Sequence, residues 1–497
     1  MSTALIIAIA YFVLLSVGVS LYLRKKVKSG SDFVTGGSTL AWPLVTAAFV
    51  LAPLGSGHTL SLWESSATLG ASVLWWGIIS GGIFVPLFLL WFGPWFRSLD
   101  VKTFPEGMGK LFGKKIGWLI SAVFPAQLIG ICIAEVMATA TAFYALSGGK
   151  EGVLEYSPDC IILAVVLTIL YIIAAGLMQV AWMNLFNAIM LIVGSFLAVF
   201  YTGSWLSKEH AGWGGVAEIY ANAGEAWKIS LLDFSPGIVW GVMVPCLFLV
   251  VFMCSASQAQ NQPMLLAKSD SDVRRGVFWA AFINSMVTYP WVVLALVGMT
   301  FAGIAGLEGA AIKSVPELAL MALPSWMVGL LMIALLAATL STTSILTLAS
   351  SHIIVHDIFK QVVHPKMSDR TFLRLTRMMI FVCMILVIIP ALTSPRILPL
   401  LMWIFSFAIP VFVVYLIGML WKVNKAAAWI TILAGYAADF LWTIVPPPGL
   451  PQELYLNVYP TTIVTLVAGI VLNLILPGKP GYLRQIKAEA RQAAAGA

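Results

Sequence analysis

Residues 45–66 read VTAAFVLAPLGSGHTLSLWESS, and the six residues Ala52-Pro53-Leu54-Gly55-Ser56-Gly57 within them decide how the rest of the chain is interpreted. The flanking residues are apolar enough for a membrane-spanning helix, which needs about 20 of them. A proline and two glycines in so short a stretch interrupt the i→i−4 hydrogen bonds of such a helix and free backbone carbonyl groups. The stretch therefore predicts a broken transmembrane helix over residues 42–66.

The composition of the whole chain supports a membrane environment. Of its 497 residues, 60% are hydrophobic and only 10% are charged, which is too few charges to cover the surface of a water-soluble protein of this length. Long unbroken apolar runs predict helices rather than barrel strands, because a spanning helix satisfies all its backbone groups internally. The five cysteines follow no disulfide or metal-ligand pattern, and we interpret them as buried apolar residues.

Apolar runs long enough for a bilayer predict an all-α polytopic membrane protein with about 13 transmembrane helices. The first run lacks a basic leader and is followed by RKKVK at 24–28, so we interpret it as a retained helix rather than a signal peptide. The predicted spans lie near 3–23, 42–66, 70–95, 116–146, 160–177, 180–206, 236–257, 276–303, 317–355, 372–393, 397–421, 426–446 and 457–477.

Lys and Arg are distributed unequally between alternate loops. The loops after the first, third, seventh, ninth and eleventh spans, together with the C-terminal tail, carry 23 of the 28 basic residues. Cytoplasmic loops of membrane proteins are rich in Lys and Arg. The distribution predicts a multi-pass protein of the plasma (inner) membrane with its N-terminus outside and its C-terminus in the cytoplasm. It also explains the net charge of +7 without a nucleic-acid partner.

A second interrupted helix would give the chain an internal repeat. The seventh span follows the broken span by five helices and has Gly241 and Pro245 in its interior. Transporters built from inverted repeats place their binding sites where the leading helix of each half is broken, although Pro and Gly are also common in ordinary membrane helices. We predict a leading helix and cytoplasmic loop at 1–40, a first five-helix repeat at 41–206, an extracellular loop at 207–235, a second five-helix repeat at 236–421, two C-terminal helices at 422–477 and a cytoplasmic tail at 478–497, with the two repeats forming a 5+5 inverted-repeat core.

The ninth span is rich in hydroxyl side chains and reads AATLSTTS at 337–344. Ala338, Ser341 and Thr342 share one helical face, because residues three and four apart are neighbours on a helix. Hydroxyl and carbonyl oxygens are hard, neutral ligands that suit an alkali cation, and carbonyls freed at the break in the second span could complete such a site. The alternative is that these hydroxyls only bond their own helix or support packing.

Four motifs occur in an informative order along the chain. They are Phe33-Val34-Thr35-Gly36-Gly37, then Pro94-Trp95-Phe96-Arg97-Ser98-Leu99 with Thr103 and Glu106, then YIIAAGLMQVAW from Tyr171 to Trp182, and finally Ala338-x-x-Ser341-Thr342. Their order and spacing resemble the sodium:solute symporter family over roughly residues 5–430. The resemblance implies sodium-coupled solute transport, with one sodium ion bound by Ala338, Ser341 and Thr342 and by the carbonyls of Ala52 and Gly55.

Departures from the family pattern bear on the ion count and the solute. Many relatives have Thr-Asp after Trp182, where this chain has Met183 and the neutral Asn184, and Ile345 replaces a hydroxyl residue. Both family residues help to form a second sodium site in some members, so the resemblance implies one sodium here rather than two. The segment 258–263 keeps the family's glutamines and loses its charged residues, which leaves the identity of the solute open.

Candidate solute contacts follow from charge at membrane depth and from proximity to the breaks. A charged side chain there costs about 2.5–3.5 kcal/mol on insertion scales and is functional by default. Glu135 lies well inside the fourth span, and its alternative role is a protonated carboxyl in a helix contact. His58 follows the break, and its alternative is a neutral imidazole bonded to a carbonyl. The candidate contacts are Ser56, His58, Thr59, Trp63, Glu135, Phe248, Phe252 and Ser255, with Trp75 and Trp76 as further aromatic walls.

We therefore predict a secondary active transporter, not an enzyme, that couples uptake of a small polar organic solute to the entry of one sodium ion. Amino acids, carboxylates and amines remain candidate solutes. One alternative is proton-coupled transport on the same fold, with Glu135 or His58 as the relay. Another is a transporter-like sensor that has kept the scaffold. The predicted partners are the solute and the lipid bilayer, and the sequence does not determine the oligomeric state.

Overall fold

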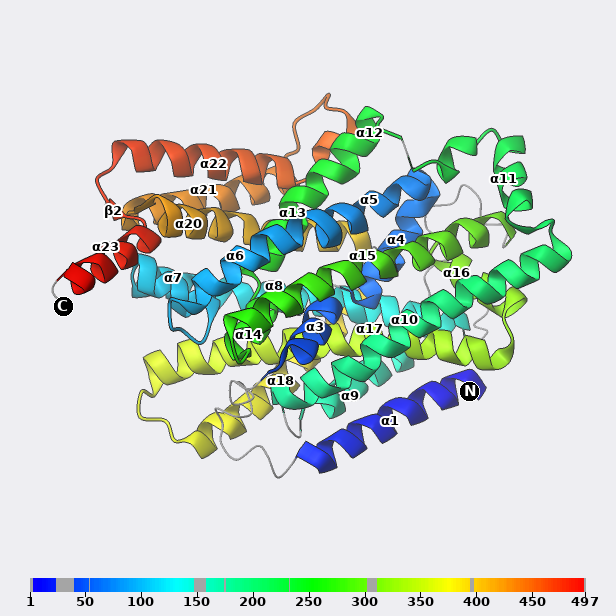
Figure 1. Ribbon diagram of the computed structural model, residues 1–497, viewed down its shortest axis with the longest axis horizontal. Helices are drawn as coiled ribbons and strands as arrows, with labels where there is room; N and C mark the ends of the chain where they lie inside the picture. Colours follow the sequence, from blue (N-terminus) through cyan, green and yellow to red (C-terminus); the bar gives the residue numbers. More distant parts are fainter. Residues whose placement is uncertain are drawn as a thin grey trace.

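The computed structural model describes residues 3–23, 40–52, 54–146, 158–173, 176–231, 233–301, 311–393 and 397–495. Most of these residues are helical, and the longer helices run side by side along the long axis of the molecule (Figure 1). The predicted all-α membrane fold is confirmed. Pro53 and the motif at 33–37 lie outside the described residues.

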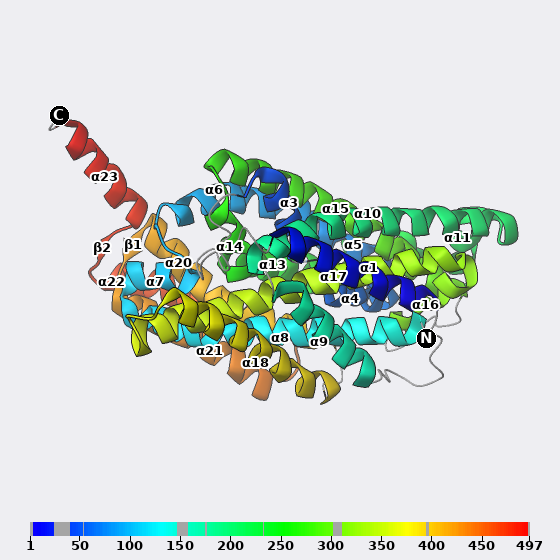
Figure 2. The same cartoon turned by 90° about the horizontal axis from the view of Figure 1, so that it is seen from below.

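The helices of the first part of the chain are α1 (Thr3–Leu23), α3 (Trp42–Leu51), α4 (Ser56–Leu69), η2 (Gly70–Val73), α5 (Leu74–Gly77), η3 (Ile78–Phe84), α6 (Val85–Arg97), α7 (Phe104–Phe112), α8 (Lys114–Leu146), α9 (Pro158–Ile172), α10 (Gly176–Glu209), α11 (Gly212–Asn222) and η4 (Ala226–Ile229). The remaining helices are α12 (Pro236–Ile238), η5 (Val239–Met243), α13 (Val244–Ala256), α14 (Gln258–Leu266), α15 (Asp270–Phe301), α16 (Ala311–Ala322), α17 (Ser325–His352), η7 (Ile353–Val363), α18 (Asp369–Thr393), α19 (Ile397–Ser406), α20 (Ala408–Leu420), α21 (Lys425–Ile444), η8 (Gln452–Tyr455), α22 (Val458–Ile475) and α23 (Tyr482–Ala495). A short antiparallel pair, β1 (Lys422–Val423) with β2 (Lys479–Pro480), joins α20 to the tail, and α23 projects from the bundle (Figure 2).

Each of the predicted spans contains helix, but the count of thirteen is not confirmed. Among the described residues, nine helices are long and apolar enough to cross a membrane, and the bent pair of α3 with the helix at Ser56–Gly77 would be a tenth. The difference arises where helices are short or change type. The predicted span at 70–95 consists of 3₁₀, α and π segments, and α9 has only 15 residues. The predicted loop at 207–235 contains α11 and η4, and the start of the predicted span at 317–355 belongs to the separate helix α16.

The first break lies where the sequence places it. α3 ends at Leu51 and α4 begins at Ser56, and the bend between α3 and the helical unit Ser56–Gly77 is 47°. Gly55 has an extended backbone at φ −77° and ψ 173°, and it is the N-cap residue of α4. The break exposes the C-terminal carbonyls of α3 and the N-terminal N–H groups of α4 to other helices.

The sequence analysis expected the second break at Gly241 and Pro245, but the helix is not broken at these residues. Gly241 lies in the π-helix η5, and Pro245 lies in the first turn of α13, where a missing N–H is tolerated. The wider turn of the π-helix accommodates the glycine and the nearby proline, so the helix continues through them. The chain leaves the helix at Ser257, which has an extended backbone, and continues as α14.

α7 is a helix that the sequence analysis did not predict, although its start carries a capping signature. Thr103 is its N-cap residue and accepts the Glu106 N–H at 3.1 Å, while the Glu106 carboxylate accepts the Lys102 N–H at 2.8 Å. This reciprocal arrangement resembles a capping box. The Thr103 hydroxyl also donates to the Asp357 carboxylate at 2.8 Å, so one side chain starts α7 and fixes it to η7.

The same end of the bundle is closed by further polar bonds. One Arg97 nitrogen donates to the carbonyls of Met264 and Ala267 at 2.7 and 2.9 Å. The side-chain amide oxygen of Gln258 accepts the Phe104 N–H at 2.7 Å. These contacts tie the segment after α6 to α14, the helix that follows the second break.

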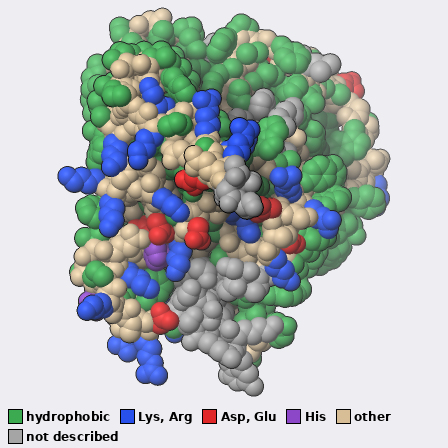
Figure 3. Space-filling model, turned by 60° about the vertical axis from the view of Figure 1, so that its left-hand side comes forward, with side chains coloured by type: hydrophobic (Ala, Val, Ile, Leu, Met, Phe, Trp, Pro, Cys, Tyr) green, Lys and Arg blue, Asp and Glu red, His purple; other side chains and the backbone are tan. Residues whose placement is uncertain are grey.

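Basic side chains gather at this end of the molecule. Figure 3 turns the left-hand end of Figure 1 toward the reader, and many Lys and Arg side chains are visible there. This end contains α7, α14 and α23 (Figure 1). The asymmetry counted in the sequence is therefore also an asymmetry in space, and the assignment of this end to the cytoplasm stays a prediction.

We expect Thr103→Val to destabilise the protein by about 2 kcal/mol, because α7 loses its cap and Asp357 loses a buried donor. Thr103→Ser keeps the hydroxyl and should stay close to the parent protein. Thermal unfolding of the purified protein measures both variants. Thr393→Val is the control, because among the described residues that exposed hydroxyl bonds only carbonyls of its own helix. Equal melting temperatures for the Val and Ser variants at position 103 would contradict the assignment.

Candidate functional site

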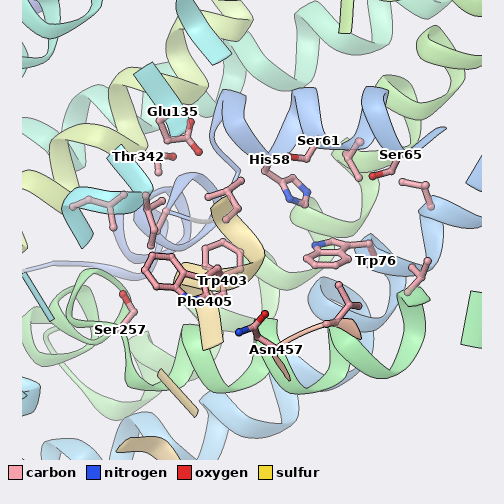
Figure 4. Close-up of a pocket in the computed structure, with 18 of the residues that line it drawn as sticks. His58, Ser61, Ser65, Trp76, Glu135, Ser257, Thr342, Trp403, Phe405 and Asn457 are labelled. Atoms are coloured by element: carbon pink, nitrogen blue, oxygen red, sulfur yellow. The ribbon is translucent and has the colours of Figure 1, made fainter. Parts of the chain in front are cut away.

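A cavity of about 390 Å³ lies beside the first break (Figure 4). Its wall combines residues of α4, η2, α5, α8, η5, α14, α17 and α19 with Ala52 at the end of α3 and the segment before α22. Two of these helices, α4 and α5, lie away from the basic end of the bundle (Figure 1). The wall is mainly apolar, and its polar members are His58, Ser61, Ser65, Glu135, Ser257, Gln260, Thr342, Tyr455 and Asn457 together with the indoles of Trp76 and Trp403.

Glu135 of α8 caps the helix that begins after the break. Its carboxylate accepts the Gly57 N–H at 3.0 Å and faces the Ser56 hydroxyl at 3.4 Å. The N-terminus of a helix carries a partial positive charge and unpaired N–H groups, so it favours a carboxylate. A Cβ atom at Gly55 would overlap this carboxylate, which explains why a glycine stands there. Glu135 is 2% exposed and also lines the cavity.

Hydroxyl groups of three helices meet behind the carboxylate. The Ser56 hydroxyl lies 3.0 Å from that of Thr139 and 3.2 Å from the Glu135 carbonyl. Thr339 of α17 contacts both hydroxyls. Ser56 therefore fixes α4 to α8 and α17 and is not a residue of the cavity wall.

The Thr342 side chain of α17 reaches the end of α3, whereas the Ser341 hydroxyl bonds its own helix. The Thr342 hydroxyl donates to the Leu51 carbonyl at 2.6 Å, and the Ser341 hydroxyl donates to the Ala338 carbonyl at 2.8 Å. Thr342 is also part of the cavity wall beside Ala52. The oxygen lone pairs of both hydroxyls remain able to accept a cation, and the C-terminus of α3 carries a partial negative charge. The donor set fits a sodium ion.

Gly55 is placed differently from the rest of this predicted set. Its carbonyl accepts the Thr59 N–H at 3.1 Å and the Thr59 hydroxyl at 3.2 Å. Both bonds belong to the first turn of α4. The contact seen between the break and α17 uses the Leu51 carbonyl instead.

The predicted solute contacts divide into two groups. His58, Glu135 and the further candidate Trp76 line the cavity, and the rings of His58 and Trp76 lie 6.4 Å apart. The others pack elsewhere among the described residues. Trp63 lies against Trp291, Phe248 packs on Phe252, Phe252 packs on Phe412, Thr59 bonds its own helix and the Ser255 carbonyl accepts from Asn261.

Several wall residues were not found from the sequence. Trp403 and Phe405 come from α19, and Tyr455 and Asn457 come from the segment between α21 and α22, outside the predicted repeat core. None of these residues has a sequence signal for a binding site. Ser257 and Gln260 did have a signal, because they stand at the second break, but that break was expected at another position.

Asn184, which stands where relatives have an aspartate, belongs to a local group of three hydrogen-bonded side chains. The Tyr171 hydroxyl donates to the Asn184 side-chain oxygen at 3.0 Å, and the Asn187 amide donates to the Tyr171 hydroxyl at 2.6 Å. These bonds join α9 to α10. Ile345 is fully buried and offers no oxygen atom from its side chain.

The family model described as the sodium:solute symporter family matches residues 33–435. The chain belongs to the sodium:solute symporter family. Among curated members, it is 23% identical to a sodium/glucose cotransporter of Vibrio parahaemolyticus, over 93% of this chain and 90% of the relative. It is 24% identical to the sodium/myo-inositol cotransporter 2 of Rattus norvegicus, over 87% of this chain and 68% of the relative.

Among solved structures, the chain is similar to a Na⁺-coupled sialic acid symporter in a substrate-bound, outward-open state. The TM-score is 0.80 at 18% sequence identity, over 97% of this chain and 99% of the other. This likeness confirms the fold of the symporter family. The family relation also confirms a multi-pass membrane protein that transports a small solute.

We expect Gly55→Ala to destabilise this symporter by about 2 kcal/mol, because overpacking typically costs about 1–3 kcal/mol and the displaced carboxylate loses its bond to Gly57. Glu135→Ala removes the obstacle, so the double variant should be more stable than the sum of the single effects predicts. Thermal unfolding of the four proteins gives the coupling. Gly18→Ala is the control, because a Cβ there meets nothing within 4 Å. Additive effects would show that Gly55 and Glu135 do not interlock.

Proposed function

We propose that the protein takes up a small polar organic solute together with one sodium ion by alternating access. The observation that carries this proposal is the contact of Thr342 with the Leu51 carbonyl, beside Ala338 and Ser341. It brings a hydroxyl face of α17 to the negative end of the broken helix α3. We assign sodium binding to Ala338, Ser341 and Thr342 with carbonyls at the end of α3, Ala52 included.

In this proposal sodium enters from the outside and binds between α3 and α17. The ion connects two helices that belong to different predicted repeats, and it stabilises the outward state that receives the solute. The solute then occupies the cavity next to Glu135 and His58. Release to the cytoplasm requires the contacts at the basic end to open, including those of Arg97 and Thr103.

A stoichiometry of one sodium is supported by the residues around the replaced aspartate. Asn184 has no charge, and its side-chain oxygen is bonded by Tyr171. Ile345 supplies no hydroxyl. A second alkali ion in this region would lack the carboxylate and the hydroxyl that its family site uses.

Proton coupling on the same fold is the second candidate, and Glu135 is the observation that favours it. A buried carboxylate that also faces the cavity can take up and release a proton as its surroundings change. The two candidates differ in their dependence on Ser341 and Thr342. Removing these hydroxyls should weaken uptake that is driven by sodium and should change little in uptake that is driven by a proton on Glu135.

We expect Thr342→Ala and Ser341→Ala each to raise the sodium concentration for half-maximal uptake at least tenfold, because each removes an oxygen ligand. Uptake into proteoliposomes is measured with potassium replacing sodium, so that ionic strength stays constant. Ser350→Ala is the matched control, because this buried hydroxyl of α17 bonds the Leu346 carbonyl of its own helix. Uptake that ignores sodium and collapses when the pH gradient is removed would reject sodium coupling.

Stoichiometry can be read from the accumulation limit at zero membrane potential. A tenfold sodium gradient stores about 1.4 kcal/mol per ion, so one sodium supports about tenfold solute accumulation and two would support about a hundredfold. Proteoliposomes with equal potassium on both sides and valinomycin hold the potential at zero, so the charge of the solute does not enter. An accumulation well above tenfold would contradict a single sodium.

A further inference from the structure

We propose that the solute is a small organic ammonium ion, which places its positive charge beside Glu135 and between aromatic rings of the cavity. The inference rests on the proposed function, because it names the class of solute for the same cavity. Four observations support it: the charge of the wall, the Glu135 carboxylate at the N-terminus of α4, the aromatic side chains, and the hydrogen bonds that other polar wall residues already make.

The charge of the wall favours a cation. Its described residues include one carboxylate, Glu135, and one imidazole, His58, but no Lys or Arg. Moving a lone charge into a membrane interior costs several kcal/mol unless a partner compensates it. Glu135 supplies that partner for a cation. For an anion, the described wall has no residue with a permanent positive charge.

The place where a carboxylate solute would bind is already occupied. Helix N-termini at breaks hold anionic solute groups in transporters of this architecture. Here the N-terminus of α4 donates its Gly57 N–H to the Glu135 carboxylate at 3.0 Å. A second carboxylate at this terminus would be repelled by the charge of Glu135. The cavity therefore disfavours acids.

Aromatic side chains line the same space as the carboxylate. Figure 4 shows the rings of Trp76, Trp403 and Phe405 at the cavity that Glu135 also borders. Tyr455 adds a fourth ring. Aromatic faces attract organic ammonium groups. A carboxylate combined with several rings is the arrangement that binds alkylated amines.

Three polar groups of the wall already donate hydrogen bonds within the protein, which leaves fewer donors for a sugar or a polyol. The Ser61 hydroxyl donates to the Gly57 carbonyl at 2.7 Å, and the Thr342 hydroxyl donates to Leu51. The Asn457 amide donates to the Asp439 carbonyl at 2.9 Å. A polyol site must provide many hydrogen bonds at once, and these donors are already used within the protein. An ammonium ion needs a negative charge and apolar contact instead.

Choline and 3,3-dimethylbutan-1-ol provide the test, because they share size and shape and differ in charge. Binding to the purified full-length protein is measured by titration calorimetry in sodium chloride and in potassium chloride. Glucose, myo-inositol and acetate are measured in parallel. We expect choline to bind at least tenfold more tightly than its neutral analogue and more tightly than the sugars and acetate.

Variants connect this preference to the cavity. Glu135→Gln should remove at least tenfold of the choline affinity and abolish the preference over the neutral analogue, and Trp403→Leu should weaken choline more than the analogue. Glu218→Gln on α11 and Trp326→Leu on α17 are matched controls outside the wall. If Glu135→Gln does not fold, Trp403→Leu and the comparison of the two ligands on the parent protein still decide the result.

The outcomes separate the solute class from the proposed coupling. Equal affinity for choline and its analogue, or stronger binding of acetate or a sugar, overturns the ammonium assignment. Sodium-driven uptake of a sugar or a carboxylate overturns it too, and leaves the proposed function intact. Choline binding that is charge-selective but identical in sodium and potassium supports the solute class and counts against sodium coupling.

Discussion

Backbone groups freed at a helix break inside a membrane must find partners within the protein, and this constraint organises the whole molecule. At the break between α3 and α4, two side chains hydrogen-bond freed backbone groups directly. Thr342 of α17 donates to the Leu51 carbonyl, and Glu135 of α8 accepts the Gly57 N–H. Because these partners come from separate helices, the break is held by the same residues that border the cavity.

The two ends of the break have opposite polarity, which fits the proposal that one irregular segment serves both an ion and a solute. The C-terminus of α3 is partially negative and faces hydroxyl oxygens, an environment for an alkali cation. The N-terminus of α4 is partially positive and is capped by Glu135, which in turn presents negative charge to the cavity. A sodium ion near Leu51 would compete with the Thr342 proton for the carbonyl oxygen. In the proposed mechanism, ion binding and the contact between α3 and α17 would therefore be linked through one atom.

The sequence predicts best what depends on local pattern. Hydropathy located the helices, the Pro and Gly residues after Leu51 located the first break, and the cost of burying a charge singled out Glu135. The second break was misplaced, because Pro245 falls in a first helical turn next to a π-helix and is tolerated there. The signature that starts α7, Thr103 followed three residues later by Glu106, could have been recognised from sequence. It was overlooked because the segment is short and not apolar enough to span a membrane.

Trp403, Phe405, Tyr455 and Asn457 could not have been found in this way. Their place in the cavity depends on how distant helices pack, and no local pattern marks them. The same limit applies to the choice of carbonyl at the first break. Family resemblance pointed to Gly55, but the Gly55 carbonyl is directed into α4 by Thr59, and Leu51 meets Thr342 instead. Which backbone carbonyl can contact α17 depends on the path of the folded backbone rather than on residue type.

The two C-terminal helices lie outside the predicted repeat core, yet the cavity depends on them through one buried carboxylate. Asp439 of α21 is fully buried and accepts the hydroxyls of Ser406 and Thr461 at 2.7 and 3.2 Å. Ser406 ends α19, the helix that carries Trp403 and Phe405, and the Asp439 carbonyl holds the Asn457 amide. A buried carboxylate is costly unless hydrogen bonds compensate it, so these bonds also fix where α19 and the segment before α22 can lie. Any rocking of α19 must carry α21 with it or break the bonds to Asp439, and the C-terminal helices thus belong to the machinery that shapes the cavity.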